Sequence, residues 1–296
     1  MIFEYRHMEL IKMQFAANTF IWRSPFSTKT DLDLIDKVKE IGFDFIEIAV
    51  EFPDLIELST LQYTLRQKGM QAVMCGVFGP GRNLSSLEEE ERANADSYLK
   101  WMINAAAEME TNLVIGPMYS AVGKARLEDP AAREQEWQLA VSGLKAMCKY
   151  AADRDVRLAF EPLNRFETDM VNVVEQGLKL IDDVGEPNLG LHIDTFHMHL
   201  EEKDPAAAIR EAGDRVFHVH ACENDRGVPG TGQVNWEEIF KALRGINYQG
   251  IVSIESFTPE VKSIARAVCI WRTIASDQDS IARDGLEFLK SLPGVV

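Results

Sequence analysis

The sequence predicts an α/β fold, a (β/α)₈ barrel that forms a single domain over residues 1–296. Eight short apolar runs alternate with longer amphipathic stretches along the 296 residues, which is the element order of such a barrel. No low-complexity linker divides the chain. An open doubly wound sheet is the alternative, but the first apolar run is not followed by G-x-G-x-x-G.

The eight runs are rich in Val, Ile or Phe and are bounded by Gly, Pro, Asn or Asp. This pattern is typical of strands that are buried on both faces of a parallel sheet. In chain order the predicted strands are 13–20, 44–50, 71–77, 112–116, 156–161, 189–194, 216–220 and 250–255.

The stretches between the runs have helical periodicity, and the long one at 86–109 begins Glu-rich and becomes apolar, as the helix dipole favours. The predicted helices are 31–41, 86–109, 132–153, 174–184, 236–243 and 261–274. Residues 1–12 are predicted to be an extension ahead of the first strand. Residues 277–296 are predicted to be a C-terminal helix that closes the barrel or contacts another subunit.

The net charge excludes two classes of partner. The chain has 31 Lys+Arg against 47 Asp+Glu, a formal charge of −16. Binding to nucleic acid or to an anionic membrane surface requires concentrated Lys and Arg, so we expect neither.

The four cysteines are scattered, the N-terminus has no apolar signal segment, and no apolar run is long enough to span a bilayer. These features predict a cytoplasmic protein.

Polar side chains stand at the ends of the last four predicted strands, where barrel enzymes carry their catalytic groups. They are Glu161, Asp194, His220 and Glu255, at intervals of 33, 26 and 35 residues. A barrel of about 250 residues has roughly 31 residues per strand–helix unit. One such residue per consecutive unit would therefore meet the others at the mouth of the barrel.

Three carboxylates and one imidazole form an oxygen-rich ligand set for one divalent ion per subunit. Such a set suits Mn²⁺, Co²⁺ or Mg²⁺ better than structural Zn²⁺, which prefers sulfur and nitrogen in a closed tetrahedron. Any one of these residues alone could be a capping or salt-bridged side chain. All four at successive strand ends favour a metal site.

Three further polar residues follow the predicted ligands at short intervals. Glu167, His197 and Arg226 are expected on the loops above the metal, where they could bind substrate hydroxyls and a carbonyl. The alternative for Arg226 is a surface ion pair with Glu223 or Asp225. The glycine-rich segment 227–233 could hold a phosphate, but a surface turn before the next helix is the favoured interpretation.

Taken together, these motifs resemble the ketose 3-epimerases, namely the D-tagatose, D-psicose (allulose) and L-ribulose 3-epimerases of the xylose-isomerase-like TIM-barrel superfamily. The matching segments are 161–167, 194–198, His218-x-His220 with Arg226, and Glu255. Residues 82–86 and Trp271-Arg272 also match, so that the resemblance covers most of the chain.

The resemblance implies residue roles, a cofactor and partners. It implies one divalent metal ion, with Mn²⁺ or Co²⁺ preferred to Mg²⁺, bound by Glu161, Asp194, His220 and Glu255. Glu161 and Glu255 would be the acid/base pair, and Glu167, His197 and Arg226 would hold O1 and O2 of a free, unphosphorylated ketose. The family also implies a homodimer or homotetramer. Cys222 and Ser256 depart from the Gly and Pro of many members and leave the substrate preference open.

The proposed chemistry requires such a site. Epimerisation at C3 of a 2-ketose removes a proton α to a carbonyl and returns one to the opposite face. A metal that stabilises the cis-enediolate and two carboxylates on opposite faces meet this need.

The alternatives are an aldose–ketose isomerase, which usually needs a second metal and a catalytic Lys, and a non-catalytic sugar-binding barrel. A metal-dependent DNA-repair nuclease shares the architecture, but the net charge opposes it.

Overall fold

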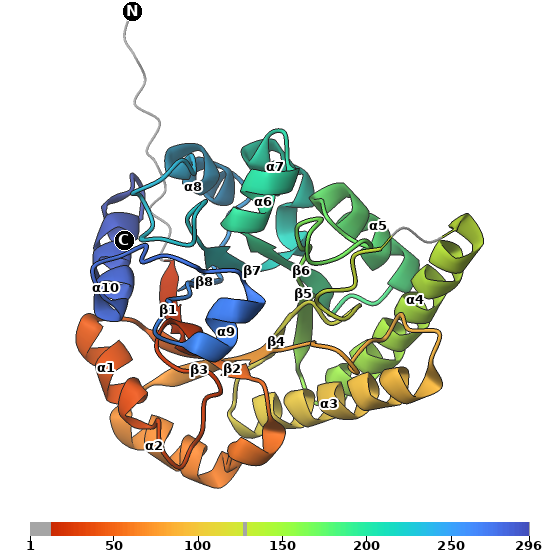
Figure 1. The fold of residues 1–296 in the computed structure, drawn as a ribbon, viewed down its shortest axis with the longest axis horizontal. Coiled ribbons are helices and arrows are strands. Elements are labelled where there is room, and N and C mark those ends of the chain that lie inside the picture. The colour runs from red at the N-terminus through yellow and green to blue at the C-terminus, as the bar shows by residue number, and fades with distance from the viewer. Residues whose placement is uncertain (1–12, 127–128, 296) are drawn as a thin grey trace, which may run out of the picture.

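Eight parallel strands close into a barrel in the computed structural model, which describes residues 13–126 and 129–295 (Figure 1). Strands adjacent in sequence are adjacent in the barrel, and β8 pairs with β1. The strands are β1 (Gln14–Asn18), β2 (Phe45–Val50), β3 (Gln71–Gly76), β4 (Leu113–Gly116), β5 (Arg157–Phe160), β6 (Leu189–Asp194), β7 (Val216–Ala221) and β8 (Ile251–Ile254). This confirms the predicted (β/α)₈ fold. The extension predicted at 1–12 lies outside the described residues.

Helices surround the barrel (Figure 1). The α-helices are α1 (Asp33–Ile41), α2 (Leu58–Lys68), α3 (Glu89–Glu108), α4 (Pro130–Ala152), α5 (Val174–Val184), α6 (Thr195–Glu201), α7 (Pro205–Ala212), α8 (Trp236–Gly245), α9 (Lys262–Ala267) and α10 (Gln278–Ser291). Short 3₁₀ helices are η1 (Thr19–Ile21), η2 (Pro53–Leu55) and η3 (Gly213–Arg215). None of the helices in the described part of the chain has the length and hydropathy needed to cross a membrane.

The predicted elements differ from the observed ones mainly at their ends. The first strand stops at Asn18, not at residue 20, because the Asn18 side chain accepts a hydrogen bond from the Phe20 amide at 2.8 Å and starts η1. The helix predicted over 261–274 covers only α9, and Cys269 beyond it has a φ of 59°. Helices α2, α6 and α7 were not predicted from the sequence.

Some of the buried side chains of the barrel strands are apolar and others are polar. The apolar ones include a small cluster that contains Ala16, Phe45, Val73, Cys75, Leu113, Ile115 and Ala159. Towards the carboxyl ends, Asn18, Glu47, His192, His218 and Ser253 are fully buried polar residues of the strands. Since alternate residues of a barrel strand point inwards, this polar layer lies directly beneath the mouth. The main core lies between strands and helices.

Candidate active site and metal centre

The strand ends place the four predicted metal ligands at one end of the barrel. Glu161 and Glu255 directly follow β5 and β8, Asp194 is the last residue of β6, and His220 lies near the end of β7. All four are buried. The Oδ1 of Asp194 accepts the amides of Phe196 and His197 at the start of α6. Its other oxygen, Oδ2, lies near His220 Nδ1 and Arg226 Nη1.

The four side chains meet around the imidazole of His220. Its Nδ1 lies 3.8 Å from Glu161 Oε1, 3.7 Å from Asp194 Oδ2 and 3.6 Å from Glu255 Oε2. His220 Nδ1 and Glu161 Oε1 are buried and have no hydrogen-bond partner. Glu161, Asp194 and His220 each offer a ligand atom within 4.8 Å of the others. Because unpaired buried groups of this kind are costly, the arrangement fits a divalent cation with oxygen ligands and one nitrogen ligand.

The carboxylates differ in their electrostatic surroundings. Burial raises the pKa of Glu161 well above its ordinary value, and the neighbouring Asp194 and Glu255 raise it further. Burial also opposes ionisation of Asp194, but Arg226 and His220 outweigh it and hold the pKa of Asp194 below its ordinary value. The site therefore holds one carboxyl group that retains its proton easily beside another that stays ionised.

Arg226 lies inside the site and not on the surface. Its Nη1 is 3.2 Å from Asp194 Oδ2 and 3.0 Å from Glu255 Oε2, and its guanidinium lies over the Phe196 ring at 3.9 Å. The alternative surface pair with Glu223 or Asp225 is wrong: Asp225 pairs with Arg272, and Glu223 binds other groups. Arg226 thus links two carboxylates of the proposed ligand set.

His197 and Glu167 are joined through Asn164, a residue that the sequence did not single out. The Asn164 amide donates to His197 Nδ1 at 3.0 Å, and its side-chain Nδ2 donates to Glu167 Oε1 at 2.8 Å. Burial lowers the pKa of His197, so the ring is neutral and carries its proton on Nε2. That Nε2 lies 3.8 Å from Glu161 Oε1. His197 lies in the first turn of α6, not on a loop as predicted.

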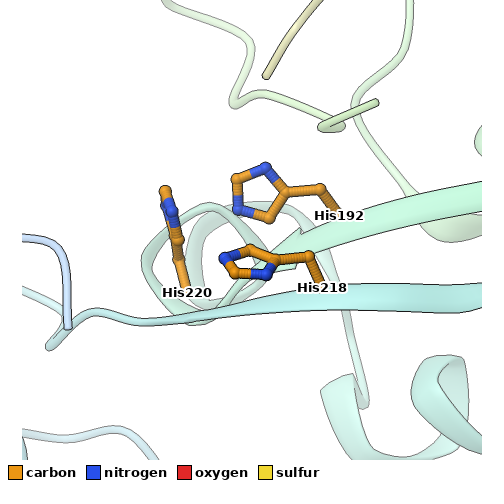
Figure 2. Close-up of side chains that lie close together, drawn as sticks. All are labelled: His192, His218 and His220. Atoms are coloured by element: carbon orange, nitrogen blue, oxygen red, sulfur yellow. The ribbon is translucent and has the colours of Figure 1, made fainter. Parts of the chain in front are cut away.

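A polar layer beneath the four ligands was also missed. The rings of His192, His218 and His220 lie edge to face, with centroids 4.0 to 5.4 Å apart (Figure 2). Glu47 Oε2 accepts from His218 Nε2 at 2.8 Å, and its Oε1 accepts from His220 Nε2 at 2.7 Å. Burial alone would raise the pKa of Glu47, but the two histidines hold it well below the ordinary value. The sequence feature that could have revealed this layer is Glu47, a charged residue at the centre of the apolar run 44–50.

The glycine-rich segment 227–233 forms a turn that is organised by Glu223. The Glu223 carboxylate accepts the amides of Gly230 at 2.8 Å and Val234 at 3.0 Å, together with the indole N–H of Trp236 at 2.9 Å. The amide of Gln233 donates to the Asn224 side chain. These amides already have partners, which agrees with the favoured surface turn and weakens the phosphate interpretation.

Known proteins share this architecture. A family model described as "Xylose isomerase-like TIM barrel" matches residues 35–292. A protein of Synechocystis sp. named "Probable ketose 3-epimerase" is 36% identical over 94% of this chain and 96% of its own length. The D-psicose 3-epimerase of Agrobacterium fabrum is 31% identical over 92% of this chain and 96% of its own length.

A solved structure has the same fold. The D-allulose 3-epimerase from Methylomonas sp. in complex with D-allulose superposes with a TM-score of 0.88 at 30% identity, over 95% of this chain and 97% of that one. Epimerases such as these relatives belong to the isomerase class of enzymes. The family model and these relatives match almost the whole barrel, including the strand ends that carry the predicted site. The chain therefore belongs to the xylose isomerase-like TIM-barrel family and, within it, to the ketose 3-epimerases.

Proposed function

We propose that this protein is a metal-dependent epimerase that reversibly inverts C3 of free ketoses, of the D-fructose/D-psicose, D-tagatose and L-ribulose/L-xylulose type. The observation that carries this proposal is the placement of Glu161 and Glu255. They lie at the ends of β5 and β8, which are three strands apart in the barrel, and both approach His220 Nδ1. Two carboxyl groups that face one reacting carbon from different sides are what a two-face proton exchange requires.

We propose Glu161, Asp194, His220 and Glu255 as the ligands of one divalent ion per subunit. Three carboxylates and one imidazole favour Mn²⁺ or Co²⁺, with Mg²⁺ as a further candidate. A bound divalent ion supplies Lewis-acid stabilisation of negative charge on the substrate oxygens. The unpaired buried atoms Glu161 Oε1 and His220 Nδ1 support this assignment.

The acid/base roles are assigned to Glu161 and Glu255. In each direction one carboxylate removes the C3 proton and the other carboxyl group delivers a proton to the opposite face. Burial raises the pKa of Glu161, which suits a group that accepts and holds a proton, and Glu255 is paired with Arg226 at 3.0 Å. The reaction is symmetrical, so each group takes the other role for the reverse epimerisation.

Substrate binding is assigned to Glu167, His197 and Arg226. His197 Nε2 and the Arg226 guanidinium are donors aimed at the site, which suits the O1 and O2 end of a ketose as negative charge develops there. Glu167 is an acceptor for a substrate hydroxyl, and Asn164 holds it beside His197. Related structures contain D-allulose and D-tagatose, which supports an unphosphorylated sugar as substrate.

The proposal extends to the state of the protein in the cell. We propose a cytoplasmic homodimer or homotetramer that binds neither nucleic acid nor membranes, in keeping with the formal charge of −16. The exposed Trp271 and Phe166 side chains support contact with a second copy. Light scattering of the purified protein tests this, and a monomer at micromolar concentration would contradict it.

Incubation in D₂O tests the proposed reaction. The protein loaded with Mn²⁺ is mixed with D-fructose or L-ribulose, and the sugars are analysed by NMR. We expect the 3-epimer to form and to carry solvent deuterium at C3. An aldose product without solvent deuterium would indicate hydride transfer in an aldose–ketose isomerase, and sugar binding without turnover would indicate a binding protein. Either outcome would overturn the proposal.

A further inference from the structure

The polar layer beneath the proposed metal ligands centres on one carboxylate, that of Glu47. Glu47 lies in the middle of β2 and is completely buried. Each of its oxygens accepts two hydrogen bonds. Oε1 accepts from Asn18 Nδ2 at 2.5 Å and from His220 Nε2 at 2.7 Å. Oε2 accepts from His218 Nε2 at 2.8 Å and from the hydroxyl of Ser253.

These partners fix the direction of each hydrogen bond. The Oδ1 of Asn18 already accepts the Phe20 amide, so the Asn18 NH₂ group is turned towards Glu47. A carboxylate is an acceptor only, and so Nε2 of His220 must carry a hydrogen. When His220 is neutral, its other nitrogen, Nδ1, is then a lone pair with no hydrogen.

That lone pair faces three carboxylates. Glu161, Asp194 and Glu255 oxygens lie 3.6 to 3.8 Å from His220 Nδ1, and no hydrogen-bond donor reaches this nitrogen. The edge of the His192 ring packs on His220 with centroids 4.0 Å apart, so the imidazole is also held by packing (Figure 2). The nitrogen is thus directed to the place where the cation is proposed.

We infer that Glu47 is the positioning residue of the metal centre: it fixes the tautomer and the ring orientation of His220 so that Nδ1 is presented as a metal ligand. The inference rests on the metal dependence proposed above. Glu47 itself lies on the far side of the ring and takes no part in proton exchange at the sugar. Carboxylates that bind the second nitrogen of a ligating histidine typically strengthen metal binding by about 10- to 100-fold.

The substitution Glu47→Gln tests the inference. A glutamine side chain has nearly the same shape, but its NH₂ group is a donor, so it cannot accept from Nε2 of both His218 and His220. We expect folded E47Q to bind Mn²⁺ with a dissociation constant about 10- to 100-fold above that of the wild type, measured by calorimetry on metal-stripped protein. The Mn²⁺ concentration for half-maximal activity should rise in parallel. At saturating Mn²⁺, kcat should recover most of its wild-type value.

Glu136→Gln is the matched control. Glu136 is also a buried glutamate, but it pairs with Lys124 at 2.7 Å and lies outside the metal site. We expect E136Q to bind Mn²⁺ as the wild type does. Glu47→Asp is the second variant, in case E47Q does not fold; it keeps the charge, but its shorter side chain cannot hold both histidines, so Mn²⁺ affinity should again fall.

The outcomes separate the two proposals. Wild-type protein that binds no divalent metal would overturn the proposed metal dependence itself. Wild-type protein that binds Mn²⁺ together with a folded E47Q or E47D of unchanged Mn²⁺ affinity would overturn only the role of Glu47. A loss of kcat that saturating Mn²⁺ does not restore would also contradict a positioning role, because it would place Glu47 in the reaction itself.

Discussion

Two buried glutamates in the same barrel, Glu47 and Glu161, have opposite surroundings. Glu47 accepts four hydrogen bonds, whereas Oε1 of Glu161 accepts none. Accordingly, the pKa of Glu47 is held well below the ordinary value by His220 and His218 against the effect of burial. The pKa of Glu161 is raised well above it by burial and by the nearby Asp194 and Glu255.

The difference shows that burial alone does not decide what a carboxyl group does. Where donors surround the group, it is a fixed charge that orients its neighbours. Where acceptors surround it, the group is left poised to bind a cation or to exchange a proton. In this barrel the two environments are stacked, with the fully hydrogen-bonded Glu47 below and Glu161, whose Oε1 has no partner, at the strand ends.

The largest expected effect is the loss of turnover in Glu161→Gln and Glu255→Gln. An amide of the same shape cannot remove or deliver the C3 proton, so kcat should fall by about 10²- to 10⁴-fold in each variant. The measurement is epimer formation and deuterium incorporation at saturating Mn²⁺. Activity within tenfold of the wild type in either variant would remove that residue from the acid/base pair. E136Q serves as the control, with unchanged kcat expected.

Removal of the metal should separate activity from folding. A chelator is expected to reduce turnover to background, and Mn²⁺ or Co²⁺ should restore it. Added metal at 100 times its dissociation constant should stabilise the protein by about 2.7 kcal/mol. For a chain of 296 residues we expect the midpoint of thermal unfolding to rise by roughly 4 °C. Full activity after verified metal removal would contradict the metal mechanism.

The smallest effect, and the most direct test of the contrast, concerns the stability of the metal-free protein. Glu47→Gln leaves buried donors unpaired and should lower the free energy of unfolding by about 1–3 kcal/mol. Glu161→Gln removes a carboxyl group that is difficult to ionise when buried, so E161Q should be at least as stable as the wild type at pH 7.

The pH dependence has opposite signs at the two residues. A raised folded pKa means that Glu161 costs stability once the unfolded chain ionises, above about pH 4.3. The advantage of E161Q should therefore disappear below about pH 4. A lowered folded pKa means that Glu47 contributes stability above the ordinary pKa and loses it as the pH falls. Urea unfolding of the wild type, E161Q and E47Q at pH 4 and pH 7 checks this. If the difference in free energy of unfolding from the wild type changed with pH in the same direction for both variants, the proposed contrast between Glu47 and Glu161 would be contradicted.

The fold and the strand-end site could be predicted because both depend on local patterns. Each apolar run is contiguous, and a residue at the end of a strand is recognisable without knowledge of its neighbours. Glu161, Asp194, His220 and Glu255 were therefore found from sequence, and the structure brings them together. Their roles stay predictions.

The polar layer could not be predicted because it depends on contacts between distant segments. Glu47 binds Asn18, His218, His220 and Ser253, which are 29, 171, 173 and 206 residues away. Nothing in β2 alone distinguishes a satisfied buried glutamate from one that has no partners. Asn164 was missed for a similar reason, since its role depends on His197, 33 residues further along the chain.

Arg226 adopts a left-handed backbone conformation, with a φ of 64°, and the hydroxyl of Ser256 donates to its carbonyl group. For a residue other than glycine this conformation costs roughly 1–2 kcal/mol. Glycine at this position would relieve the strain, so R226G should be more stable than R226A although both lack the guanidinium. Stability of the local backbone alone would thus favour glycine here. The arginine holds its guanidinium beside Asp194 and Glu255 in spite of the backbone strain, so the placement of this one charge has a cost that the rest of the fold must offset.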